Sequence, residues 1–150
     1  MRKLTAVLVL LVACFMANAQ VHNPVKWNYK LKKTNATTYE VQITATIDKG
    51  WHIYSQTTPD GGPVPTTIRF AKNPLVTLVG AVKEVGKLEQ RHEELFGVDV
   101  KQFSNSVSFV QTVKVKTAVK TSVVGTVEFM VCNDTQCLPP TTNKFSLSIQ

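Results

Sequence analysis

Apolar and polar residues alternate along most of this 150-residue chain, and this alternation restricts the fold more than any other feature. A period of two places successive side chains on opposite faces of a β-strand, whereas a helix needs a period near 3.6. Strand-like segments of this kind lie at residues 25–31, 39–47, 51–54, 66–70, 75–82, 98–103, 107–115, 123–131 and 145–149. No segment keeps a helical period. The sequence therefore predicts an all-β protein.

The segments between these strands carry turn and loop signals. Residues 57–65 contain three prolines and two glycines, and residues 104–106 read Ser-Asn-Ser, so we predict a loop and a turn there. Between residues 84 and 97 the alternation gives way to charged residues around a few apolar ones, which predicts an exposed loop with Leu95 and Phe96 at its tip. About eight short strands favour a β-sandwich, with a closed barrel as the alternative.

The N-terminus has the layout of a secretory signal peptide. Arg2 and Lys3 precede an apolar run, and an Ala-Asn-Ala site at residues 17–19 precedes Gln20. The run is shorter than the roughly 20 residues of a membrane-spanning helix, so we expect export to the periplasm without a transmembrane segment. In the alternative reading, residues 11–14 form a lipobox and Cys14 carries a lipid.

Cleavage after Ala19 would leave one domain, residues 20–150, with two cysteines and a net charge that falls from +7 to +5. An even number of cysteines in an exported chain permits a disulfide. The lysines are spread along the strands without interleaved aromatic residues, which favours a solvated face over a nucleic-acid or anionic surface. We expect a monomer that does not bind nucleic acid.

Cys132 and Cys137 are separated by four polar residues, a spacing that a tight hairpin can bring within disulfide range. A structural disulfide is the general expectation for exported proteins, but closing a loop of about six residues contributes only about 2 kcal/mol. Two adjacent thiols also suit redox exchange, because the second resolves a mixed disulfide formed by the first. A metal site is disfavoured, since no second pair of ligands stands at zinc spacing. Strand parity places Cys132 on the face away from the main core.

The block from Val131 to Thr141, which includes both cysteines and the Pro139-Pro140 pair, resembles the active-site hairpin of the N-terminal periplasmic domain of the thiol:disulfide interchange protein DsbD. Residues 50–54, Gly-Trp-His-Ile-Tyr, resemble that family's aromatic strand, and residues 92–97 resemble its cap loop. The resemblance covers the mature chain. The best-known member has five residues between its cysteines, an aromatic residue in place of Leu95 and a phenol in place of His52.

This resemblance implies an immunoglobulin-like β-sandwich without cofactor or metal, whose cysteines relay reducing equivalents. A thioredoxin-like protein would donate the electrons, and exported thiol proteins, such as a disulfide isomerase or a cytochrome c maturation protein, would accept them. Members with a membrane domain and a thioredoxin-like domain carry their own donor, so this chain is expected to act as a separate shuttle. The implied site consists of Cys132 and Cys137, the cap-loop residues Glu93, Glu94, Leu95, Phe96 and Gly97, and the neighbours Trp51, His52, Tyr54, Pro139 and Pro140.

Each site residue also has a structural interpretation. Trp51 and Tyr54 can be core residues, His52 a polar strand position, and the two glutamates solvated loop charges. Two rival functions follow from the residues alone: a non-catalytic binding or adhesion module with a structural disulfide, and a chaperone-like domain that adds unfolded segments to an exposed strand edge.

Overall fold

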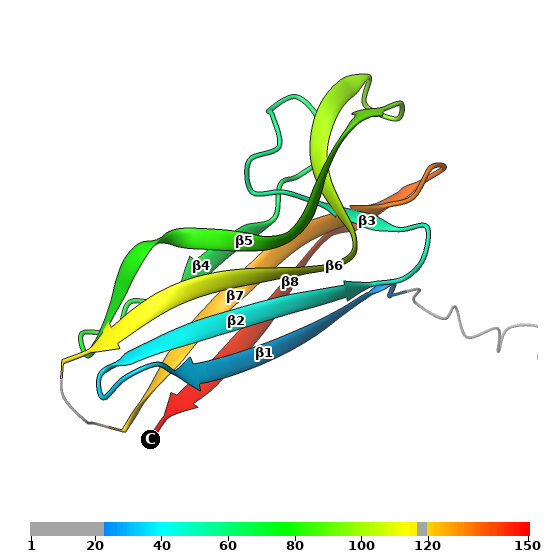
Figure 1. Ribbon diagram of the computed structural model, residues 1–150. Coiled ribbons are helices and arrows are strands. Elements are labelled where there is room, and N and C mark those ends of the chain that lie inside the picture. Colours follow the sequence, from blue (N-terminus) through cyan, green and yellow to red (C-terminus); the bar gives the residue numbers. More distant parts are fainter. Residues whose placement is uncertain (1–22, 117–119) are drawn as a thin grey trace, which may run out of the picture.

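The computed structural model describes residues 23–116 and 120–150, which form eight β-strands (Figure 1). The strands are β1 (Val25–Lys33), β2 (Thr38–Ile47), β3 (His52–Tyr54), β4 (Thr67–Phe70), β5 (Val76–Glu93), β6 (Val98–Val115), β7 (Thr121–Cys132) and β8 (Cys137–Ile149). The all-β prediction is confirmed. Within the described residues, no helix is long and apolar enough to cross a membrane. The predicted signal peptide and Cys14 lie outside them.

All strand pairs are antiparallel, in the order β1-β2-β6-β3-β7-β4, with β5 added to β6 and β8 added to β7. The short strand β3 pairs with both long strands, so it joins the β1-β2-β6-β5 half to the β4-β7-β8 half. The sheet curls so that the two halves face each other as an immunoglobulin-like β-sandwich. β1 pairs only with β2 and β4 only with β7 within the described chain, so the barrel alternative is wrong.

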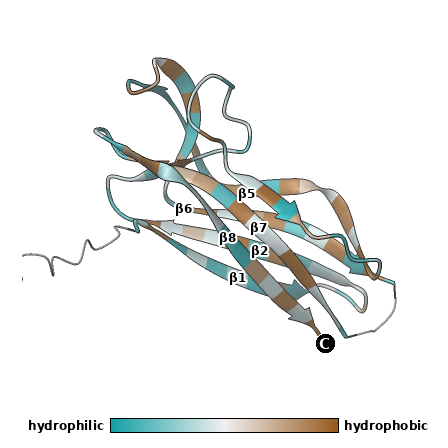
Figure 2. Cartoon of the chain, turned by 180° about the vertical axis from the view of Figure 1, so that it is seen from behind, coloured by the Kyte–Doolittle hydropathy of each residue, from teal (hydrophilic) through white to brown (hydrophobic). Residues whose placement is uncertain are grey.

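The core lies between the two halves and follows the alternation of the sequence, which is visible along the strands in Figure 2. On β7 the predicted inward parity is confirmed, because Val123, Val127, Phe129 and Val131 are buried. Gly125 shares this face. A Cβ atom at Gly125 would lie 2.5 Å from the backbone oxygen of Arg69 and from the Phe145 ring, so only glycine allows β4 and β8 to approach β7 this closely.

The predicted loop at residues 84–97 is wrong for most of its length. β5 continues to Glu93 and pairs with β6 as far as Val98, which leaves a loop of only residues 94–97. We call residues 88–103 the cap hairpin. It projects beyond the sandwich at one end (Figure 1). Most β5 side chains in it are exposed, so no buried face imposed an apolar alternation, and backbone pairing with β6 holds the strand.

The predicted turn at residues 104–106 is also wrong, since β6 runs through it without interruption. Asn105 has a φ of 64°, the one positive φ among the described non-glycine residues. On the paired strand, the register shifts between Gly86 and Leu88. The turn-forming residues therefore mark a bulge, which lies where the cap hairpin leaves the plane of the sandwich.

Candidate redox-active site

The two cysteines face each other at the mouth of a hairpin. Cys132 ends β7, Cys137 begins β8, and the two form a disulfide with their Cα atoms 4.0 Å apart. Asn133 shapes the connection: its Oδ1 accepts hydrogen bonds from the backbone N–H of Thr135 and of Gln136, both at 2.9 Å. The backbone N–H of Asn133 also donates to the carbonyl of Gln136, at 2.9 Å, so side chain and backbone of Asn133 together close the turn. The hairpin thus holds the two sulfurs together independently of the rest of the site.

Burial distinguishes the two cysteines. Cys132 has no exposed surface, whereas Cys137 is half-buried. Cys132 does face away from the main core, as its parity predicted, but this face is covered rather than open to solvent. It packs in a small second cluster with Tyr54 of β3 and Val100 of β6, to which Val98 and Met130 also contribute. The cap hairpin contributes Val98 and Val100 to this cluster. The prediction of a loop at residues 84–97 could not reveal this packing.

A buried polar network lies beside Cys132. His52 is the register partner of Cys132, and its Nε2 lies 3.1 Å from both Tyr54 Oη and Glu93 Oε2. Tyr54 Oη donates a hydrogen bond of 2.8 Å to the same Glu93 oxygen. All three residues are buried. The glutamate comes from the cap hairpin and its two partners from β3, so the network ties the cap hairpin to the strand next to the disulfide.

Burial shifts the pKa values of Tyr54 and His52 in opposite directions. Burial, and then the Glu93 carboxylate, raise the pKa of the Tyr54 phenol, so the phenol stays protonated and donates. Burial lowers the pKa of His52, and the hydrogen bond and charge of Glu93 oppose this effect. The interpretation of Glu93 as a solvated loop charge is therefore wrong. His52 occupies a polar position on β3, in agreement with its structural interpretation, and is buried within the network.

The tip of the cap hairpin carries the other predicted cap residues. The backbone N–H groups of Phe96 and Gly97 both donate to the carbonyl of Glu93, and Gly97 adopts a φ of 67° that favours glycine. Leu95 and Phe96 keep 47% and 37% of their surface exposed. Glu94 and Asp134 line one open pocket with His52, Glu93 and Gln102. The cap loop and the loop between the two cysteines, residues 133–136, thus border the same pocket. Coverage of the sulfurs by Leu95 and Phe96 stays a prediction.

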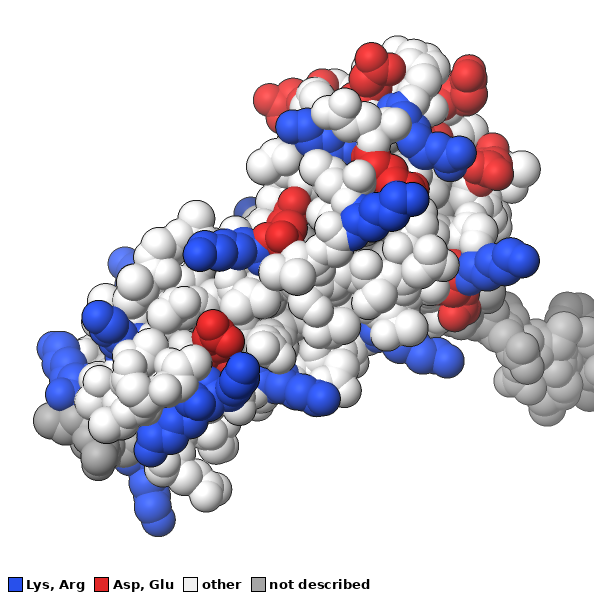
Figure 3. All heavy atoms as spheres, in the orientation of Figure 1, with Lys and Arg blue, Asp and Glu red and all other residues white. Residues whose placement is uncertain are grey.

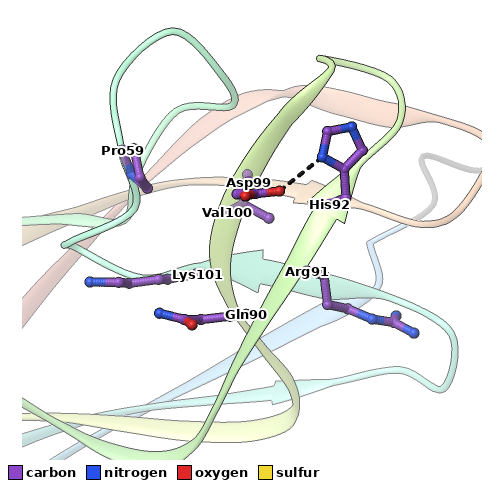
Figure 4. A pocket seen from close by; sticks show the side chains of 7 residues that line it. All are labelled: Pro59, Gln90, Arg91, His92, Asp99, Val100 and Lys101. Atoms are coloured by element: carbon purple, nitrogen blue, oxygen red, sulfur yellow. Dashed lines mark hydrogen bonds and ion pairs between the residues drawn. The ribbon is translucent and has the colours of Figure 1, made fainter.

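A second pocket lies on the cap hairpin (Figure 4). Pro59, Val100 and Lys101 line it together with His92 and Asp99, whose Nδ1 and Oδ1 atoms are 2.9 Å apart. The Asp99 carboxylate raises the pKa of His92. This pair is exposed and joins register partners across the hairpin, so it contributes little to stability. No cysteine lines the pocket.

The remaining predicted neighbours are spread more widely. Trp51 is buried in the main core, in agreement with its structural interpretation. Pro139 and Pro140 lie in β8, two and three residues after Cys137, and are exposed, and Pro139 lines a pocket with Phe129 and Leu138. Among residues 23–116 and 120–150, no group of three or more His, Cys, Asp or Glu side chains is placed to hold a metal ion.

The family model described as "Thiol:disulfide interchange protein DsbD, N-terminal" matches residues 19–149. The chain belongs to the DsbD N-terminal domain family. A comparison with curated protein sequences finds no match. The resemblance inferred from the cysteine hairpin, the aromatic strand and the cap loop is therefore confirmed at the level of the family.

Three solved structures share the fold of this DsbD N-terminal family member. The N-terminal periplasmic domain of ScsB from Proteus mirabilis matches with a TM-score of 0.60 and 14% identity over 88% of this chain, which spans 48% of that one. The reduced DsbD N-terminal domain of Neisseria meningitidis has a TM-score of 0.51 and 15% identity, covering 81% of this chain and 84% of that one. The complex between the DsbD and PilB N-terminal domains of Neisseria meningitidis matches with a TM-score of 0.55 and 15% identity. The match covers 87% of this chain and 88% of that one.

Two residues of this DsbD-type site were missed in the sequence. Val100 packs against Cys132, and Gln102 is 1% exposed, lines the pocket of the network and leaves its side-chain nitrogen without a hydrogen-bond partner in the described structure. Both share strand parity with Val98, so the face was visible in the sequence. What it packs against was not visible, because that depends on the path of the cap hairpin.

Proposed function

We propose that Cys132 and Cys137 form a dithiol/disulfide relay that passes reducing equivalents to exported thiol proteins. The observation that carries this proposal is the asymmetry of the pair: one cysteine is fully buried and the other half-buried, in a hairpin beside an anchored cap. A cysteine that keeps part of its surface exposed can be reached by a partner, while its buried neighbour is protected from other thiols. As a cross-link the disulfide contributes only about 2 kcal/mol, which makes a purely structural role a weak explanation.

The chemistry needs no group outside the two proteins. In the reduced domain, the Cys137 thiolate attacks one sulfur of the partner's disulfide and forms a mixed disulfide, and the partner's other sulfur leaves as a thiolate that takes up a proton. The Cys132 thiol then loses its proton, and its thiolate attacks the Cys137 sulfur. This re-forms the Cys132–Cys137 bond and releases the partner's second thiol. Two electrons pass to the partner, and a thioredoxin-like dithiol returns them by the reverse sequence of steps.

We place this relay in the periplasm, as residues 20–150 after signal-peptide cleavage. The partners in this proposal are a thioredoxin-like donor and an acceptor of the disulfide isomerase or cytochrome c maturation type. The complex of the DsbD and PilB N-terminal domains of Neisseria meningitidis supports it, because a domain of this fold there binds a separate protein domain. Mass spectrometry of the mature N-terminus separates cleavage before Gln20 from lipidation of Cys14.

The cap hairpin would control access to the pair. Glu93, the last β5 residue before the tip loop, ties the hairpin to Tyr54 and His52, whereas Leu95 and Phe96 in that loop are exposed. We propose that these two side chains cover the sulfurs in the resting oxidised protein and move aside for a partner. The tip can move without loss of the main core, since neither residue belongs to it.

Trapping with single-cysteine variants tests the relay. Cys132→Ser keeps the reachable thiol and cannot resolve a mixed disulfide, so it should accumulate partner adducts in a periplasmic extract. Cys137→Ser is the matched control, and it should accumulate few adducts because its remaining thiol is buried. The reduction potential against glutathione is measured on the unmodified protein. A potential below about −300 mV together with no adducts in either variant would identify a structural disulfide and refute the relay.

A further inference from the structure

Six exposed lysines gather at the end of the sandwich opposite the cysteine hairpin. They belong to the end of β1, the connection before β5, the end of β6 and the start of β7: Lys32, Lys33, Lys72, Lys114, Lys116 and Lys120. We call these six residues the basic end. The cysteines lie at the other end of β7, a strand of 12 residues. At about 3.3 Å per residue, the disulfide is about 35 Å away.

Hydrogen bonds between the connections bring the lysines together. The backbone N–H of Val115 donates to Thr37 in the β1–β2 turn, at 2.9 Å, and that of Lys116 donates to Leu75, at 3.4 Å. Asn73 Nδ2 donates to the carbonyl of Ser122 on β7, at 2.9 Å. Four segments that are distant in sequence are therefore tied into one surface. The even spread of lysines along the sequence concealed this.

The charge of the basic end is nearly uncompensated. In its segments, residues 32–40, 71–79, 112–116 and 120–124, Glu40 is the single acidic residue, and it lies opposite Lys32. None of the six lysines forms an ion pair within the described part of the chain. In Figure 3, Lys and Arg residues lie at this end with few acidic residues among them, whereas most acidic residues lie at the end with the cap hairpin, together with further Lys and Arg. The acidic residues are therefore distributed unevenly along the long axis, with few at the basic end and most at the end with the cap hairpin.

Exposed apolar side chains accompany the lysines. Leu75, just before β5, and Leu78 and Val79 in β5 are 38–45% exposed, and Val124 on β7 is 41% exposed. The backbone N–H of Ala71 donates to the carbonyl of Val124, which places the two apolar groups on neighbouring segments. A solvated charged face would not need such residues. Lysines around exposed apolar side chains are typical of surfaces that rest at the membrane interface.

We propose that the basic end binds the surface of an anionic phospholipid bilayer and holds the cysteine hairpin away from it. The lysines would contact the phosphate headgroups, and Leu75 and Leu78 would enter the interface between them. A nucleic acid is a poorer fit, because no exposed aromatic residue lies among these lysines in the described structure to stack on bases. The proposal is independent of the redox chemistry, since it uses none of the residues around the disulfide.

Vesicle co-sedimentation tests the proposal on residues 20–150, which contain all eight strands. Vesicles of phosphatidylglycerol and phosphatidylcholine in equal parts are compared with pure phosphatidylcholine at low salt. Each lysine near an anionic surface contributes about a fivefold change in partitioning, so Lys72→Glu/Lys116→Glu should lower binding at least about 25-fold. The matched control, Lys26→Glu/Lys49→Glu, makes the same change of charge with exposed lysines at the cysteine end. It should lower binding by less than about threefold.

Further measurements separate the sources of the effect. Leu75→Ser/Leu78→Ser should weaken binding at unchanged charge, and excess inorganic phosphate should not compete beyond its contribution to ionic strength. Circular dichroism confirms that each variant is folded. Equal losses in the two lysine pairs would overturn the proposal in favour of net charge alone. Binding to DNA or heparin without binding to the anionic vesicles, or no binding to any vesicle at low salt, would also overturn it.

Discussion

Replacement of Tyr54 by phenylalanine tests whether the buried network guards the disulfide. The substitution removes one oxygen atom and keeps the ring that packs against Cys132. That oxygen donates the 2.8 Å bond to Glu93, which is the shortest link between β3 and the cap hairpin in the network. After the change, Glu93 keeps His52 as its partner. The cap hairpin should then open more easily while the cluster around Cys132 stays filled.

The expected size of the effect follows from the kind of bond that is lost. A buried hydrogen bond to a charged group contributes about 1.5–3 kcal/mol, so Tyr54→Phe should lower the free energy of unfolding by about 2 kcal/mol. The same loss of about 2 kcal/mol lowers the free energy of local opening of the cap hairpin, so the population of the opened form would rise about 30-fold. If the opened form is the one that reacts, reduction of the disulfide by a small dithiol should accelerate about 10- to 30-fold.

Two measurements check this prediction: urea denaturation and the rate at which dithiothreitol reduces the disulfide. Tyr29→Phe serves as the control, because it removes a phenol on β1 whose ring stacks on Phe145 in the main core, at 5.3 Å. Its reduction rate should match that of the parent. A Tyr54→Phe protein that loses about 2 kcal/mol but is reduced at the parental rate would show that the network stabilises the sandwich without controlling access to the sulfurs.

Two further predictions concern pH and packing. Burial lowers the pKa of His52 below its usual 6.5, so the unfolded chain binds a proton at this residue more readily than the folded protein does. The free energy of unfolding should therefore be independent of His52 protonation above about pH 6.5 and decline as the pH falls below this value. Urea titrations should show a smaller decline for His52→Gln than for the protein with His52. Both proteins carry His92→Gln, because the pKa of His92 is shifted in the opposite direction. Equal declines would contradict the role of His52. Gly125→Ala should lower the free energy of unfolding by about 1–3 kcal/mol through overpacking against the Arg69 carbonyl. Gly86→Ala, with nearest contacts of 3.2 Å, should cost less, and the reverse order in urea midpoints would refute the packing argument.

Prediction from sequence succeeded where a residue faces the main core and failed where the cover comes from a distant segment. The parity of β7 correctly separated Val131 from Cys132, because alternation is a local property of a strand that is buried on one face. The same parity could not show that Val100 and Tyr54 close over Cys132. Glu93 is the clearest case, since a glutamate in a charged stretch is usually solvated, yet this one is 7% exposed with two buried partners.

The sequence by itself determined the all-β class, the position of most strands, the cysteine hairpin and the family. These features depend on local signals: period-two alternation, turn residues and short motifs. The tertiary structure alone decided that residues 84–93 form a strand, that the hairpin they build covers Cys132, and that six lysines from four segments meet at one end. Each of these features depends on pairing between segments far apart in the chain, and the residues involved carry no local pattern that specifies their partner.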